Sequence, residues 1–126
     1  MVVSQNGIII VSHVQCADSF MQRLKGLMFR ASLPPDEGLL LKDCSSIHTC
    51  FMRFPIDVIY LSSRCTVLYV ETVVPWRCGR LIKGTRHILE LAAGSAESVQ
   101  LGEPVQIHPA SRENQKKKIK ENPPWL

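Results

Sequence analysis

Short apolar runs follow one another along the chain and predict a protein built mainly of β-strands. The first runs predict a hairpin over residues 2–14, because Asn6 and Gly7 tolerate the positive φ angles of a tight two-residue turn. Residues 8–11 are apolar at every position, so we expect this strand to lie in the middle of a sheet, covered on both faces.

One segment has the spacing of a helix rather than of a strand. Phe20, Leu24 and Leu27 recur every three or four residues, which predicts a single helical face directed at the core. Asp18 supplies a carboxylate that can cap the first backbone N–H groups, and Gly26 favours the left-handed conformation that ends many helices. We therefore predict one short helix between these two residues.

The rest of the chain predicts further short strands separated by turns. They cover residues 39–41, 47–52, 56–61, 65–74 and 105–107, with an element of uncertain type at 87–91. The clearest hairpin joins 56–61 to 65–74, because β-branched and aromatic residues flank a polar turn. The predicted fold class is α+β, mainly antiparallel β, with a curved sheet or a partly closed barrel and one short helix.

Composition and charge divide the chain into a domain and a tail. The 126 residues are 45% hydrophobic, which suffices for a single compact α+β domain over residues 1–109. Residues 110–126 contain few apolar side chains and a run of three lysines, so we predict a basic, disordered C-terminal tail. Most of the net charge of +4 lies in this tail, so we do not expect nucleic-acid binding except weakly through it.

The cysteines and the absence of long apolar segments indicate a compartment. The five cysteines are Cys16, Cys44, Cys50, Cys65 and Cys78. An odd number in so short a chain does not predict a disulfide framework and fits a reducing environment. No run approaches the ~20 apolar residues of a membrane span, and residues 1–15 lack the pattern of a signal peptide. We expect a soluble cytoplasmic protein with no membrane partner.

Several motifs occur in a fixed order over residues 8–108. They are RLKGLMFR at 23–30, IHTCFMRFPIDVIY at 47–60, PWR at 75–77, HILELAAG at 87–94 and LGE at 101–103. This set resembles the prokaryotic family called domain of unknown function 192. The resemblance implies a compact, β-rich α+β fold, and it implies no established activity.

Polar residues inside these motifs are the candidates for a ligand-binding site. They are His48, Arg53, Asp57, Arg77 and Glu90. Asp57 lies in an apolar run, so we expect it to be partly buried, with Arg53, His48 or backbone N–H groups of the 53–55 turn as partners. Its carboxylate is either a general base or ligand contact, or, as we favour, a group that locks a turn. His48 is either a proton shuttle or an ordinary hydrogen-bonded histidine.

Glu90 and the segment 76–87 are the remaining candidates. Glu90 lies between two leucines, and we expect it to pair with Arg53 or Arg77. Such a pair would either belong to a ligand site or be a structural ion pair. The segment 76–87 contains four basic residues, two glycines and no acid, and it is the best candidate for contacting an anion. Its basic residues are Arg77, Arg80, Lys83 and Arg86.

A metal site receives little support from the spacing of possible ligands. Cys44, His48 and Cys50 are close in sequence, but no second pair with ligand spacing accompanies them. We therefore expect neither a metal ion nor another cofactor.

These observations leave three hypotheses about function. We favour a non-enzymatic binding module for a small anionic ligand or a protein partner, because no nucleophile, base and oxyanion hole can be assembled from the sequence. The first alternative is a small hydrolase or transferase that uses Asp57 and His48 in one cleft. The second is a structural or interaction protein without a pocket, in which Phe51, Phe54 and Trp76 form an exposed apolar patch.

Overall fold

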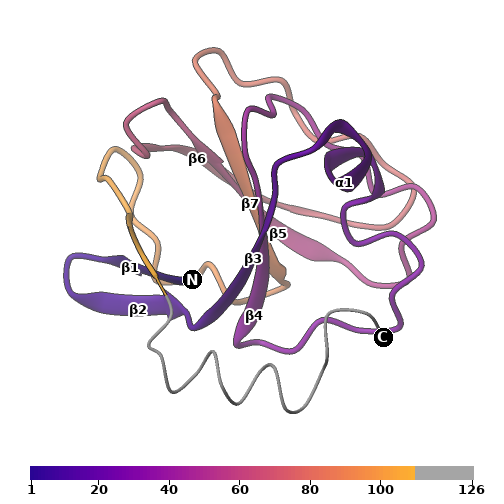
Figure 1. Ribbon diagram of the computed structural model, residues 1–126, viewed down its shortest axis with the longest axis horizontal. Helices are drawn as coiled ribbons and strands as arrows, with labels where there is room; N and C mark the ends of the chain where they lie inside the picture. The colour runs from indigo at the N-terminus through magenta and orange to yellow at the C-terminus, as the bar shows by residue number, and fades with distance from the viewer. Residues whose placement is uncertain (110–126) are drawn as a thin grey trace.

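The computed structural model describes residues 1–109 and consists of two β-sheets and one short helix (Figure 1). The smaller sheet has the order β2-β1-β8, with β1 at Val2–Gln5, β2 at Ile8–Val11 and β8 at Gln106–His108. The larger has the order β3-β4-β7-β5-β6, with β3 at His13–Ala17, β4 at Glu37–Leu41, β7 at His87–Ala92, β5 at Ile56–Leu61 and β6 at Val67–Val73. The β-rich fold with one short helix is confirmed. The strands of the described part of the chain form no closed barrel, and the predicted tail lies outside the described residues.

The predicted first hairpin is present, but its second strand is not central. Asn6 and Gly7 make the turn between β1 and β2 with φ angles of 52° and 80°. Strand β8 pairs with the other edge of β1, so β2 has a single neighbour in its sheet. Ile8 and Ile9 are consequently 62% and 60% exposed, and the prediction of a strand buried on both faces is wrong.

Helix α1 spans Phe20–Lys25 and ends at Gly26, as predicted. Its N-cap is Ser19 rather than Asp18. The Ser19 hydroxyl accepts a hydrogen bond from the backbone N–H of Gln22 at 3.2 Å, and the Gln22 side chain accepts one from the Ser19 N–H at 3.3 Å. This reciprocal pair is a capping box, which satisfies two free donors at once and so fixes the start of the helix.

The segment 47–52 is not a strand, in contrast to the prediction. Its only ladder contact is an isolated bridge between His48 and Cys78. The buried Thr49 ties it instead to the loop after β6, because the Thr49 hydroxyl donates to the carbonyl of Val74 at 2.6 Å and accepts from the N–H of Arg77 at 2.9 Å. These side-chain hydrogen bonds take the place of the regular strand pairing that the alternating pattern predicted.

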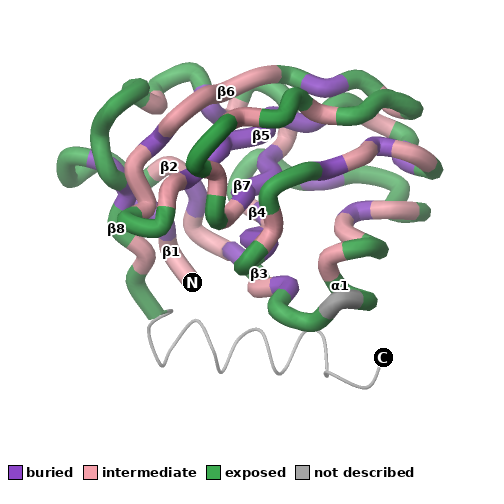
Figure 2. The backbone as a smooth tube through the Cα atoms, turned by 90° about the horizontal axis from the view of Figure 1, so that it is seen from above, coloured by how far each residue is buried: buried purple, intermediate pink, exposed green. Residues whose placement is uncertain are grey.

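The larger sheet is covered on both faces, and β7 runs through its middle (Figure 2). The smaller sheet covers one face, whose apolar residues include Leu40, Ile59, Leu61, Leu89 and Leu91. Helix α1 and the loops that follow β4 and β6 lie on the other face, whose apolar residues include Leu41, Ile56, Val58, Tyr60 and Ile88. The uncertain element at 87–91 is therefore a central strand. No helix among residues 1–109 has the length and hydropathy needed to cross a membrane.

Candidate functional site

Glu90 is an acidic residue in the buried middle of β7, the central strand of the larger sheet. It stands opposite Leu39 of β4 and Val58 of β5, on the face of the sheet that α1 covers. Its side chain is directed at the end of that helix, since a Cβ atom built on Gly26 would lie 3.7 Å from Glu90 Oε2. A glycine at the end of α1 therefore leaves space directly above the carboxyl group.

The Glu90 carboxyl group has no charged partner. The residue is 3% exposed, and its Oε2 atom is buried without a hydrogen-bond partner. Burial raises the pKa of Glu90 to about 8, because the interior disfavours the charged form. The ion pairs among residues 1–109 involve other acids, so the expected pairing with Arg53 or Arg77 is wrong. Both arginines are exposed, and Arg77 donates instead to the carbonyl of Trp76.

A pocket of about 590 Å³ opens above Glu90. It lies between the end of α1, the segment 44–48 and the segment 78–81. Its cationic groups come from Arg23 and Lys25, and Glu90 is the only acid among the described residues that line it. Leu24, Ile47 and Leu81 supply apolar surface. The site thus combines a buried acid, a basic side and an apolar wall.

Two polar side chains of the pocket are held in defined positions. Arg23 donates from one guanidinium nitrogen to the carbonyls of Asp18 at 2.7 Å and Lys42 at 3.3 Å. His48 accepts a hydrogen bond at Nδ1 from the backbone N–H of Cys50 at 3.2 Å, so in the neutral ring the proton is on Nε2. The structure therefore brings His48 and Glu90 to one pocket, as two of the five predicted site residues.

Asp57 lies on the opposite face of the sheet from this pocket. It shares the side of β5 that carries Ile59, whereas His48 lies with the loops that cover the other side. Its carboxylate accepts hydrogen bonds from Thr72 Oγ1 at 2.7 Å and from the N–H groups of Gly94 at 2.9 Å and Ala96 at 3.0 Å. The predicted partners were wrong, although the carboxylate does lock a turn, namely the one that follows β7. The sheet therefore separates Asp57 from His48.

The basic segment 76–87 does not gather its cations at one place. Arg86 pairs with Asp43 at 2.8 Å, and the Arg80 guanidinium lies 5.8 Å from the centre of the Tyr69 ring. Gly79 allows a close approach, but to protein, since a Cβ there would lie 2.5 Å from the Tyr60 hydroxyl. The cations that do line the pocket, Arg23 and Lys25, belong to the last turn of α1.

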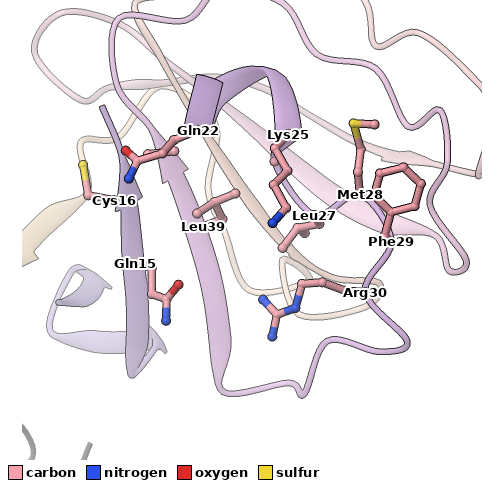
Figure 3. Close-up of a pocket in the computed structure, with 11 residues that line it drawn as sticks. Gln15, Cys16, Gln22, Lys25, Leu27, Met28, Phe29, Arg30 and Leu39 are labelled. Atoms are coloured by element: carbon pink, nitrogen blue, oxygen red, sulfur yellow. The ribbon is translucent and has the colours of Figure 1, made fainter. Parts of the chain in front are cut away.

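A second pocket, of about 640 Å³, lies on the other side of α1 (Figure 3). Gln15 and Leu39 come to it from β3 and β4, and Lys25 and Arg30 from the helix and the turn after it. Arg30 is already paired with Glu37 at 3.3 Å. Lys25 and Gly26 line both pockets, so the end of α1 separates them, and only the first contains the unpartnered acid.

Three exposed aromatic side chains form a cluster beside these loops. Phe51 lies between Phe29 and Trp76, with ring centres 5.3 Å and 4.7 Å away. The three residues have φ angles of 64° to 65°, a left-handed conformation that costs an L-residue roughly 1 kcal/mol each. They remain 48% to 61% exposed. Two of the three aromatic residues predicted to form a surface patch, Phe51 and Trp76, belong to this cluster, while Phe54 is partly buried.

Relatives of this chain share most of residues 1–109. The family model of domain of unknown function 192, described as "Uncharacterized ACR", matches residues 1–108. A UPF0127 protein of Pyrococcus horikoshii is 40% identical over 90 residues, which cover 69% of this chain and 78% of the relative. A UPF0127 protein of Pyrococcus furiosus is 34% identical over 99 residues, which cover 71% of this chain and 82% of the relative.

Solved structures share the fold. The crystal structure of a protein of unknown function from Novosphingobium aromaticivorans matches with a TM-score of 0.72 and 22% identity, over 84% of this chain and 82% of that chain. A crystal structure from Sinorhizobium meliloti, whose name proposes it as a transcription regulator, matches with a TM-score of 0.68 and 25% identity, over 74% of this chain and 79% of that chain.

Proposed function

The chain belongs to domain of unknown function 192, a family without an assigned activity, and we propose from its own site that it is a non-enzymatic binding module for a small molecule. The proposal depends on one observation: the carboxyl group of Glu90 is buried at a pocket without any partner. A buried polar group without a hydrogen bond costs a protein roughly 1 to 3 kcal/mol. A ligand that completes this hydrogen bond recovers the cost upon binding.

An apolar residue would suit position 90 of this central strand better than an acid does. The other β7 positions from Ile88 to Leu91 are apolar, and an apolar residue at position 90 would fill the same place without an unpaired polar group. Violations of this kind, and acids with perturbed pKa values, concentrate at functional sites. The position of Glu90 at a pocket, rather than in a closed core, supports a role in recognition.

Binding fits the arrangement better than the enzymatic alternative does. The hydrolase or transferase hypothesis needs Asp57 and His48 within hydrogen-bond reach in one cleft. Asp57 is saturated by Thr72 and two backbone N–H groups on the far face of the sheet, so it is not free to act with His48.

A thermal-shift screen tests this function. The full chain is heated with small acids, amines, sugars and nucleotides, and a ligand well above its Kd raises the melting temperature by several degrees. We expect a hit to act equally on wild type and on E97Q, which removes an exposed acid away from the pocket. The same compound should have no effect on E90L. A hit that stabilises E90L as strongly as wild type contradicts the proposal.

The aromatic cluster supports a second candidate function, docking of a protein partner. Phe29, Phe51 and Trp76 offer adjacent exposed rings, and aromatic residues are enriched at the centres of protein interfaces. A partner captured by wild type and then purified should bind the double variant F51S/W76S at least tenfold more weakly. Equal affinity for the two proteins removes this candidate.

We also propose that the protein works in the cytoplasm. All five cysteines are free thiols, and burial raises the pKa of Cys16 and Cys65, which keeps these two unreactive. Thiol titration of protein isolated without reductant should find every cysteine reduced after denaturation. A stable disulfide in that sample argues for an oxidising compartment.

A further inference from the structure

We propose that the pocket binds a small organic carboxylate, and that Glu90 holds it by donating a hydrogen bond from a protonated carboxyl group. The inference rests on the proposed binding function and assigns its ligand class. It follows from three features of the pocket: the protonation of Glu90, the missing acceptor, and the sign of the surrounding charge.

The surroundings of Glu90 favour the protonated form. Its side chain is buried, and no arginine, lysine or histidine among residues 1–109 lies within ion-pair distance of it. An ionised carboxylate in such a place has neither water nor a counter-charge, which the interior strongly disfavours. The raised pKa, about 8, agrees with this geometry. At neutral pH the group is therefore chiefly a neutral acid, as the binding of an anion requires.

A protonated carboxyl group is a hydrogen-bond donor, and the protein leaves it without an acceptor. Oε2 has no partner, and the residue above it is Gly26, which has no side chain to offer one. The strand neighbours Leu39 and Val58 are apolar. The acceptor then comes from what enters the pocket, either water or a ligand, and a carboxylate oxygen accepts such an O–H bond at short distance.

The charges that face the pocket select an anion. Helix α1 contributes Arg23 and Lys25, and the loops contribute His48 and the thiols of Cys44 and Cys78. No second acid among residues 1–109 lines it: Glu37 of β4 is paired with Arg30, and Asp57 of β5 lies on the other face of the sheet. Arg23 uses one nitrogen for two backbone carbonyls and retains further N–H donors. An ammonium ligand would face two cations and a neutral acid, whereas the same three groups all donate hydrogen bonds to a carboxylate.

The apolar wall distinguishes an organic acid from a bare inorganic anion. Leu24, Ile47 and Leu81 line the same pocket, and Leu24 and Leu81 are exposed in the free protein. A ligand with a carboxylate at one end and a hydrocarbon body covers these side chains, which is favourable in proportion to the apolar area removed from water. Inorganic phosphate leaves them exposed and gains nothing from them.

Titration calorimetry of the full chain with matched pairs of compounds tests the ligand class. The probes are hexanoate with hexylamine, benzoate with benzylamine, and inorganic phosphate. We expect the two carboxylates to bind at least tenfold more tightly than the amines and than phosphate. Tighter binding of the amines overturns the inference but leaves the binding function intact. If none of the five probes binds, the carboxylate assignment is wrong; the function also fails if no compound of the wider screen depends on residue 90.

The pH dependence of binding tests the role of Glu90. Wild-type affinity for hexanoate should fall about tenfold per pH unit above the pKa of Glu90, because the ionised acid cannot donate and repels the ligand. E90Q keeps a donor that does not titrate, so it should bind within about tenfold of wild type at pH 7. Its affinity should lack the fall that begins near pH 8, whereas a fall caused by any other ionisable group of the pocket would persist in E90Q. E90L should not bind. Loss of binding in E90Q, or an unchanged pH profile, overturns the inference.

Discussion

The backbone N–H of Ala96 donates a hydrogen bond of 3.0 Å to the carboxylate of Asp57, joining the turn after β7 to strand β5. The N–H of Gly94 reaches the same oxygen at 2.9 Å, and the Thr72 hydroxyl takes the other oxygen at 2.7 Å. Three donors from two elements thus meet at one buried acid. Asp57 therefore has a structural role, and the buried acid without a partner among residues 1–109 is Glu90.

D57N is therefore expected to destabilise the fold. The asparagine oxygen keeps the two backbone N–H groups, and its amide nitrogen donates to the Thr72 hydroxyl, which turns to accept. The charged acceptor is lost, and bonds between neutral groups are weaker, which costs about 1 to 2 kcal/mol of unfolding free energy, measured by urea denaturation. T72V removes a single donor and should cost about 1 kcal/mol. E97Q should change stability by less than about 0.5 kcal/mol, and a similarly small effect of D57N would contradict this structural role.

Glu90 should make stability fall as pH rises. Its pKa is raised from 4.5 in the unfolded chain to about 8 in the folded protein, so between these values the unfolded state loses a proton that the folded state keeps. The stabilising contribution is complete below pH 4.5 and is lost as the pH passes through 8. Each unit of difference between the two pKa values is worth about 1.4 kcal/mol, so the free energy of unfolding falls by about 4 to 5 kcal/mol in total.

Comparison with E90Q isolates this contribution. The variant should gain stability relative to wild type between pH 5 and pH 8, by about 3 to 4 kcal/mol. Urea denaturation at several pH values measures the difference, and other titrating groups cancel because they are common to both proteins. A difference that stays constant over this pH range means that Glu90 has an ordinary pKa.

Local patterns were enough to predict several elements of this fold. Asn6 and Gly7 specify a turn through their own backbone preferences, and Gly26 ends α1 for the same reason. The segment 47–52 failed because alternation cannot show that Thr49 would bind a distant loop with its hydroxyl. The edge position of β2 also depended on β8, which joins the sheet from the far end of the described chain.

The candidate site was less predictable than the fold. His48 and Glu90 stood out as polar residues in apolar surroundings, and both line the pocket. The sequence predicted an ion pair for Glu90. That prediction failed because the partners of a side chain in β7 depend on which loops cover the strand, and the sequence does not show this. The sequence carried no sign that Arg23 and Lys25 belong to the site, and only the packing of α1 over β7 brings them into the same pocket as the acid.

G79A should reduce stability through a clash with the Tyr60 hydroxyl. A Cβ at position 79 would lie 2.5 Å from that oxygen and 2.9 Å from Ile47. The hydroxyl cannot move freely, because it donates to Glu71 at 2.6 Å, and burial and this carboxylate raise the pKa of Tyr60. We expect a loss of about 1 to 3 kcal/mol.

The double variant Y60F/G79A tests that cause. Removing the hydroxyl makes space for the added methyl group, so G79A should cost at least about 0.5 kcal/mol less in the Y60F protein than in wild type. Additive effects in urea denaturation would show that the clash lies elsewhere, with Ile47 as the remaining close neighbour.

We expect the backbone of the aromatic cluster to be strained at Phe51, and a comparison of glycine with alanine at this position measures the strain. Phe51 has a φ angle of 64°, where an L-residue is strained and glycine is not. Both F51A and F51G lose the contacts with Phe29 and Trp76, so the aromatic contribution cancels between them. F51G should therefore be the more stable of the two by about 1 kcal/mol in urea denaturation. If F51A is as stable as F51G, the backbone at this position is relaxed, and the left-handed conformation places no constraint on the exposed rings.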